Sequence, residues 1–134
     1  MSLAWLKGGH PERFGATILI LVFGLSFIGH PWRLWNVHVF DAAFDVATTL
    51  VFGWMAATGR RWWPLAMTGV MALTVLVHVA AFADPTMSRY ADISARIGLG
   101  ILMGLTLLAG VGERWLAGEA PVSAGARWRP WKKP

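Results

Sequence analysis

Apolar residues fall in four long runs along this chain, and none of these runs contains a charged side chain. The runs cover residues 14–32, 46–59, 62–83 and 97–112. Because spanning a bilayer takes about 20 apolar residues, the second and fourth runs must extend into the polar residues beside them. The pattern therefore predicts four transmembrane helices. They are expected at roughly residues 12–30, 35–59, 62–84 and 94–116.

Short polar segments with turn-forming residues separate the runs. Pro11 suits the first turn of a helix, and Gly29 followed by Pro31 predicts the end of the first one. Asp92 or Ser94 is the expected N-cap of the last helix. Connections this short predict an all-α fold, a single four-helix transmembrane bundle without a second domain.

The basic residues indicate how this bundle is oriented. Of the twelve Lys and Arg residues, nine fall on the side that holds both termini, so the positive-inside rule predicts cytoplasmic termini. We expect a multi-pass protein of a bacterial-type inner (cytoplasmic) membrane, with residues 1–118 as its helical domain and residues 119–134 as a basic cytoplasmic tail. The tail suits lipid headgroups or the surface of a partner. Its candidate residues are Arg127, Trp128, Arg129, Trp131, Lys132 and Lys133.

Tryptophan is abundant, with nine residues, and its positions agree with the predicted helix ends. An amphipathic indole ring prefers the headgroup level of a membrane. Trp54 is the expected exception, inside the second helix. The tryptophans expected near helix ends are Trp5, Trp32, Trp35, Trp62, Trp63 and Trp115.

The composition excludes several classes of function. With 56% hydrophobic and 14% charged residues, the chain is too apolar for a soluble domain of its length. The absence of cysteine from the sequence excludes disulfides, thiolate metal sites and thiol redox chemistry. The net charge of +5 follows from the basic inner side, so it does not indicate a nucleic-acid partner. No nucleophile and base pairing and no Gly-rich phosphate loop stands out, so we do not expect an enzyme.

Three polar residues interrupt the start of the second predicted helix. His38, Asp41 and Asp45 are spaced by three and four residues, which places them on one stripe of a helix. This stripe lies in the outer half of the membrane, where His78 of the third helix should reach a similar depth. An ionisable residue at the centre of a spanning helix costs about 2.5–3.5 kcal/mol on insertion scales. Such residues therefore mark a candidate functional site.

Arg96 belongs to the same layer and is expected to have a carboxylate partner. It is expected in the first turn of the fourth helix, where the helix dipole disfavours a cation. We predict that it forms an ion pair with Asp41 or Asp45. All four helices then contribute ionisable groups to the outer half of the bundle, and the inner half should contain almost none.

Four interpretations of this cluster stay open. It can be a structural ion pair between Asp45 and Arg96, or a proton or cation site built on His38, Asp41 and Asp45. A metal site is the third, although the ligands follow no recognised spacing. The fourth is haem, ligated by His38 and His78 from facing helices.

The fourth helix is rich in glycine. Gly100 and Gly104 have the Gly-x-x-x-Gly spacing that lets two helix backbones approach closely. We predict that they pack against another helix, first of all one of this bundle.

Taken together, these patterns favour a small accessory or scaffold subunit of a larger membrane complex, such as an energy-transducing one. Membrane lipids and other membrane-protein subunits are the expected partners. The alternative is a small proton- or cation-coupled transporter or channel that uses His38, Asp41 and Asp45. A further alternative is a redox subunit that binds haem or a pigment.

Overall fold

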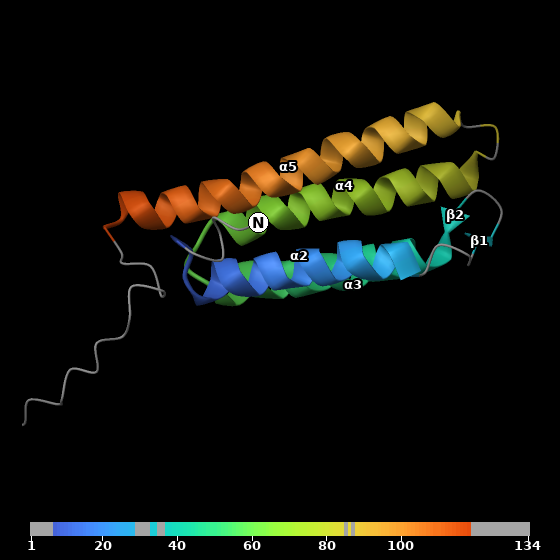
Figure 1. Cartoon of the computed structure of the whole chain (residues 1–134). Helices are drawn as coiled ribbons and strands as arrows, with labels where there is room; N and C mark the ends of the chain where they lie inside the picture. The colour runs from blue at the N-terminus through green and yellow to red at the C-terminus, as the bar shows by residue number, and fades with distance from the viewer. Residues whose placement is uncertain (1–6, 29–32, 35–36, 85, 87, 119–134) are drawn as a thin grey trace, which may run out of the picture.

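The computed structural model describes residues 7–28, 33–34, 37–84, 86 and 88–118 of the 134-residue chain. The predicted basic tail at residues 119–134, with its six candidate residues, lies outside this part. Four long α-helices dominate the described chain (Figure 1), and two extended residue pairs precede the second of them. The elements are α2 (His10–Ile28), β1 (Arg33–Leu34), β2 (Val37–His38), α3 (Val39–Thr58), α4 (Trp63–Ala83) and α5 (Arg89–Leu116).

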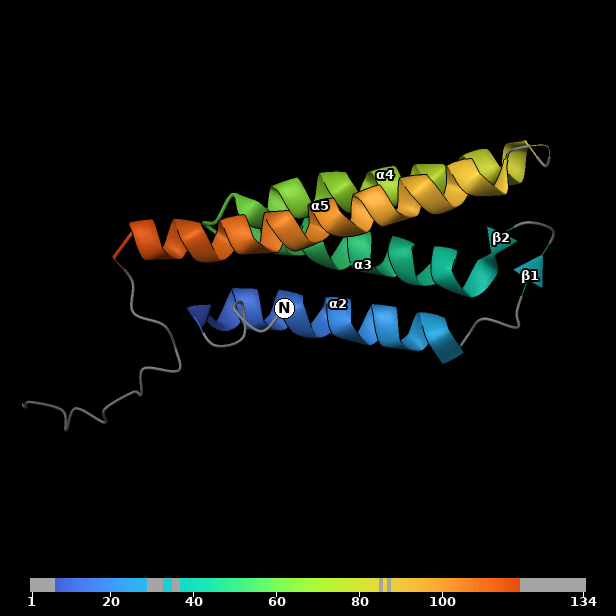
Figure 2. The ribbon, with the colours of Figure 1, turned by 45° about the horizontal axis from the view of Figure 1, so that its top comes forward.

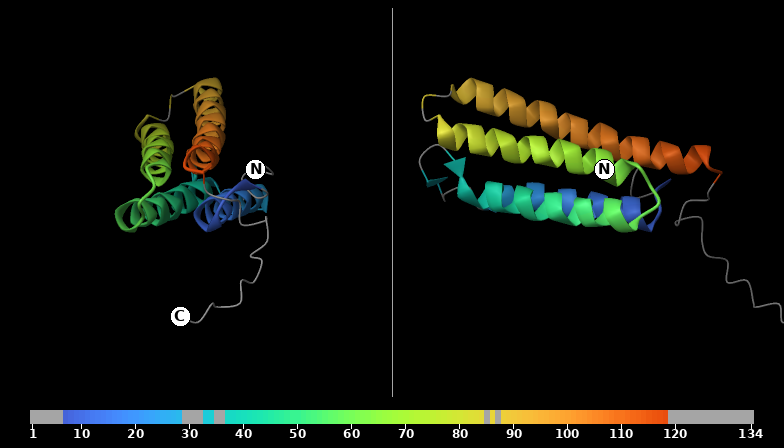
Figure 3. Two further views of the ribbon diagram at one scale, coloured as in Figure 1. Left: turned by 90° about the vertical axis from the view of Figure 1, so that its left-hand side faces the viewer. Right: turned by 180° about the vertical axis from the view of Figure 1, so that it is seen from behind.

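The four helices lie alongside one another and alternate in direction (Figures 1 and 2). α3 packs along α4, and α4 along α5, over long stretches, whereas α2 contacts α3 and α5 at fewer positions. The end-on view in Figure 3 shows α2 and α5 on the same side of the bundle, with α3 and α4 on the other. The seam between α2 and α5 is therefore the loosely packed side of the bundle.

Trp63 forms the centre of the core at the end of the bundle where α4 begins. Its side chain is fully buried and meets the ring of Phe52 edge to face, with ring centroids 6.0 Å apart. Glycines make room for the indole: a Cβ added to Gly110 would lie 2.6 Å from the ring, and one added to Gly15 would lie 2.8 Å from it. Trp63 thus lies at a helix end, as predicted, but its ring packs into the core of the bundle. Trp54, the tryptophan expected inside the second helix and not at its end, is 65% exposed.

Two of the predicted helix starts are wrong. α3 begins at Val39, because the residues before it are extended: β1 and β2 form a two-residue antiparallel ladder that pairs Arg33 with His38. α5 begins at Arg89 with Ser88 as its N-cap, whereas the sequence suggested Asp92 or Ser94.

The predicted close packing at Gly100 and Gly104 is not found within the described chain. A Cβ added to Gly104 would meet no heavy atom within 4 Å, and one added to Gly100 would meet only the ring of Phe23, at 3.8 Å. Gly100 lines a cavity instead of a helix contact, and the residues of α5 that meet the core are Met103, Leu107 and Gly110.

Three of the described helices are long and apolar enough to cross a membrane. They are Val39–Thr58, Trp63–Ala83 and Tyr90–Leu116. Large apolar side chains cover their outer surfaces, among them Leu50, Leu65 and Phe82, each more than 60% exposed. Several threonine hydroxyls within the helices donate to the carbonyl four residues earlier; that of Thr74, for example, donates to the carbonyl of Val70. An exterior of this kind is compatible with a multi-pass membrane protein.

Candidate functional site

Four ionisable side chains from three helices meet in the half of the bundle near the α4–α5 connection. Asp41 and Asp45 come from α3, His78 from α4 and Arg96 from α5. At 1.5 Å of rise per residue, the last three lie roughly 8–10 Å from the nearby ends of their helices. We call these four residues the outer cluster.

The guanidinium of Arg96 connects the three helices. Its Nη2 donates to Oδ2 of Asp41 over 3.0 Å and lies 3.2 Å from Nε2 of His78. The same His78 nitrogen lies 2.9 Å from Oδ2 of Asp45. The outer cluster is thus a continuous chain from Asp41 through Arg96 and His78 to Asp45.

The two contacts of His78 Nε2 make opposite demands on one proton. A guanidinium only donates, so Nε2 must be bare to accept from Arg96. A carboxylate only accepts, so Nε2 must carry a proton to donate to an ionised Asp45. A bare Nε2 has a single lone pair, so it accepts one hydrogen bond, either from Arg96 or from a protonated Asp45. The location of a single proton between Asp45 and His78 therefore decides which hydrogen bonds exist.

The Asp45–His78 pair that shares this proton is buried. Asp45 is 8% exposed and His78 is 5% exposed, so little water reaches the pair. With a neutral imidazole, two carboxylates and one guanidinium leave the outer cluster with one net negative charge. One proton bound to the Asp45–His78 pair brings the net charge of the outer cluster to zero.

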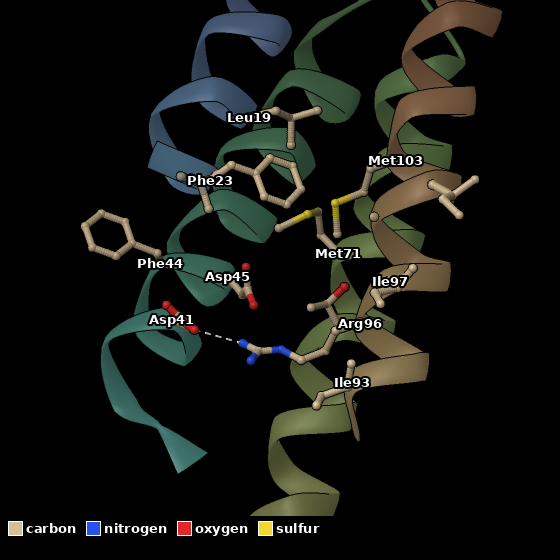
Figure 4. A pocket seen from close by; sticks show the side chains of 14 residues that line it. Leu19, Phe23, Asp41, Phe44, Asp45, Met71, Ile93, Arg96, Ile97 and Met103 are labelled. Atoms are coloured by element: carbon tan, nitrogen blue, oxygen red, sulfur yellow. Dashed lines mark hydrogen bonds and ion pairs between the residues drawn. The ribbon is translucent and has the colours of Figure 1, made fainter. Parts of the chain in front are cut away.

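A cavity of about 540 Å³ lies beside the outer cluster, between all four helices. Asp41, Asp45 and Arg96 form its polar edge, and Figure 4 shows these three side chains directed toward the space between α3 and α5. The rest of the wall is mainly apolar. Its other residues are Leu19, Val22, Phe23, Phe44, Met71, Thr74, Ile93, Ile97, Gly100, Ile101 and Met103.

The structure thus brings together four of the five residues expected in the outer half. Arg96 pairs with Asp41, one of the two expected partners, and Asp45 pairs with His78. Arg96 lies about two turns into α5, so the argument from the first turn of the helix does not apply to it. His38 belongs to β2 and not to the predicted helical stripe, and its side chain is outside the described part.

The described geometry gives no support to haem or metal ligation. His78 turns Nε2 to Asp45 and Arg96, and that nitrogen cannot keep these contacts and also ligate iron. Among the described residues, no group of three or more His, Cys, Asp or Glu side chains is placed to hold a metal ion.

The sequence prediction missed a second ionic cluster at the opposite end of the bundle. Glu12 is fully buried there. Its Oε2 accepts the backbone N–H of Gly9 at 2.6 Å, and its Oε1 accepts the indole N–H of Trp63 at 3.2 Å. Nη1 of Arg114 lies 3.9 Å from Oε2. The expectation that this half holds almost no ionisable groups is therefore wrong.

A signal for this cluster was present in the sequence. Gly9 is the residue before α2, and Glu12 is the third residue of that helix. A glutamate at this position typically reaches back to the backbone N–H of the N-cap residue. The run GHPE, with Pro11 in the first turn, therefore indicates a capping glutamate.

The comparisons with known proteins add no family and no fold neighbour. No protein-family model, no curated protein and no solved structure matches this chain.

Proposed function

We propose that this chain is a small proton-coupled transporter that works through the Asp45–His78 pair. We further propose that it spans a bacterial-type inner membrane four times, with both termini cytoplasmic. One observation carries the functional proposal: Nε2 of His78 lies between a carboxylate acceptor at 2.9 Å and a guanidinium donor at 3.2 Å. A buried pair of this kind binds or releases one proton with a change in its contacts.

The pair also sits where a proton can affect helix packing. Asp45 belongs to α3, His78 to α4 and Arg96 to α5. When the proton leaves Asp45, the carboxylate competes with the imidazole and with Asp41 for the Arg96 guanidinium. Protonation therefore biases the contacts that join α5 to the other helices, and such a bias is what coupling to transport requires.

Spectroscopy of the purified protein tests the proton site. We expect difference infrared spectra across a pH titration to show the carbonyl stretch of one protonated carboxylic acid, which Asp45→Asn removes. The ¹⁵N shifts of the His78 ring should move in the same pH range. Asp84→Asn, an exposed carboxylate outside the cluster, is the matched control and should leave both signals unchanged. A titration that is identical in the Asp45→Asn variant would sink the proposal.

The topology has its own test. Single cysteines placed at Gly118 and at Thr86 should be labelled by a membrane-impermeant reagent from opposite sides of oriented vesicles. We expect Thr86 on the outer side and Gly118 on the inner side. Labelling of both from one side means that α5 does not span the membrane, and labelling with the two sides exchanged contradicts the proposed orientation.

An accessory or scaffold subunit is the second candidate, and the glycines of α5 favour it. Added Cβ atoms at Gly98, Gly104 and Gly112 would all meet nothing within 4 Å, so these sites leave room for a helix of another chain. Gentle extraction from the native membrane should then recover the chain with stoichiometric partners, and Gly104→Leu should release them. Recovery of the chain without partners contradicts this second candidate.

A further inference from the structure

We infer that the cavity beside the outer cluster binds a lipophilic organic cation of single charge, in exchange for the proton on the Asp45–His78 pair. This inference deepens the proposed function, on which it rests, by naming the class of substrate. It depends on the charge of the cluster, on the chemistry of the cavity wall and on the side from which the cavity is open.

The charge of the cluster selects a cation. Arg96 is already held by Asp41 at 3.0 Å, so an anionic ligand would have to displace a carboxylate from it. Asp45 lines the cavity, and deprotonation of the pair leaves one net negative charge there. A ligand with a single positive charge restores neutrality, as the proton does. The cationic ligand and the proton therefore compete for one site.

All four helices contribute to the surroundings of Asp45. The charged or titratable groups are Asp41 on the same helix, His78 from α4 and Arg96 from α5. α2 contributes only apolar residues to the cavity, namely Leu19, Val22 and Phe23. In the described chain, Asp45 and His78 are therefore the groups whose proton a bound cation replaces.

The wall of the cavity selects an organic cation over a metal ion. Hard metal cations such as Ca²⁺ and Mg²⁺ need about six or more oxygen ligands. The wall of this cavity is mainly aliphatic and aromatic. The rings of Phe23 and Phe44 lie at the cavity, and aromatic faces attract cations. The volume of about 540 Å³ lies within the range of small-molecule sites.

The cavity is open on the side where α2 faces α5. Phe23 on α2 is 45% exposed, and Ile97 on α5 is 59% exposed, although both line the cavity. In a bilayer this side faces the acyl chains, so a ligand with apolar groups can enter from the lipid. A small hydrated cation has no such route.

Binding of tetraphenylphosphonium to the purified full-length chain tests the inference. We expect affinity to rise about tenfold per pH unit over the range in which the pair is protonated, because one proton leaves for each cation bound. An unbuffered sample should release that proton on addition of the cation. Asp45→Asn should weaken binding at high pH at least tenfold and abolish its pH dependence, whereas Asp84→Asn should change neither.

A second variant covers the case in which Asp45→Asn does not fold. Ile97→Trp fills the cavity without touching the pair, so it should weaken binding at least tenfold while the infrared titration of the pair persists. Ile97→Leu is its control and should bind normally. Binding of equal strength at all pH values, or unchanged binding in Ile97→Trp, overturns the inference. If the pair titrates and no cation binds, the inference fails and the proton site stands; if the pair does not titrate, both fail.

Discussion

The indole N–H of Trp63 donates a hydrogen bond of 3.2 Å to Oε1 of Glu12, which joins the first turns of α4 and α2. The contact is buried on both sides. It fixes α2, the helix with the fewest contacts to the others, at the end of the bundle opposite the outer cluster. The cavity at the other end of the α2–α5 seam can then exist without detaching α2.

Replacing Glu12 should therefore destabilise the bundle. Glu12→Ala leaves the buried N–H groups of Gly9 and Trp63 without an acceptor, at about 1–3 kcal/mol for each, so a loss of about 2–6 kcal/mol is expected. Glu12→Gln keeps one oxygen and should lose about half as much. Denaturation of the purified protein in detergent measures both, with the partly exposed Glu113→Gln as control. Equal stability of the alanine variant and the native chain contradicts the assigned contacts.

The glycines of α5 give a matched pair of substitutions. Gly110→Ala places a Cβ 2.6 Å from Cγ of Trp63, an atom near the base of a fully buried ring, so overpacking should cost about 1–3 kcal/mol. Gly104→Ala meets open space and should gain up to about 1 kcal/mol, since alanine favours helix over glycine. Thermal unfolding in detergent compares the two. A greater loss for Gly104→Ala than for Gly110→Ala would show that the helices pack through the other face.

The hydrophobic runs predicted the four helices, because an apolar stretch long enough to cross a bilayer must form a helix of about the same length. The third was predicted at 62–84 and is observed at Trp63–Ala83. Boundaries failed where local backbone pairing decides them, as at Val39, where α3 begins after the β1–β2 ladder. Periodicity also could not show which glycines meet a neighbour. That depends on the rotation of α5, which is set by the bulky indole of Trp63 packing on Gly110.

The layer of the outer cluster followed from counting residues along antiparallel helices, and this placed His78 beside the α3 carboxylates. The pairing within the layer did not follow. Asp41 and Asp45 lie one turn apart on the same helix face, so either satisfied the argument for Arg96, and side-chain geometry assigns Asp41. The run GHPE indicates the capping role of Glu12, but not its burial, because the partners Trp63 and Arg114 are distant in sequence.

The connection between α4 and α5 offers a test by pH. The hydroxyl of Thr86 donates to Oδ1 of Asp84 at 2.6 Å, and the Thr86 amide donates at 2.9 Å. Both bonds favour the carboxylate and lower the pKa of Asp84 below its usual 3.8. Carboxyl NMR shifts should therefore titrate below that value, and Thr86→Val should raise the pKa of Asp84 whereas Thr86→Ser should not.

The sign of the effect on stability follows from the lowered pKa of Asp84. Its ionised form is favoured in the folded state, so the contribution is present above pH 3.8 and is lost as the pH falls through the lower folded value. The exposed site makes this contribution small. An Asp84 pKa at or above 3.8 in the native chain contradicts the two hydrogen bonds.

The pairing of Arg96 with Asp41 predicts strong coupling between their substitutions. Side-chain exposures of 27% and 11% leave either charge poorly solvated once its partner is removed, so Asp41→Asn and Arg96→Gln should each cost about 1–3 kcal/mol. The double variant leaves no isolated charge of this pair and should recover part of the loss, with a coupling of about 0.5–3 kcal/mol. Arg96→Gln combined with Asp84→Asn is the control cycle and should be additive. Additive losses for Asp41 and Arg96 as well would mean that the 3.0 Å contact contributes nothing to stability, and the outer cluster would then not hold α5 to α3.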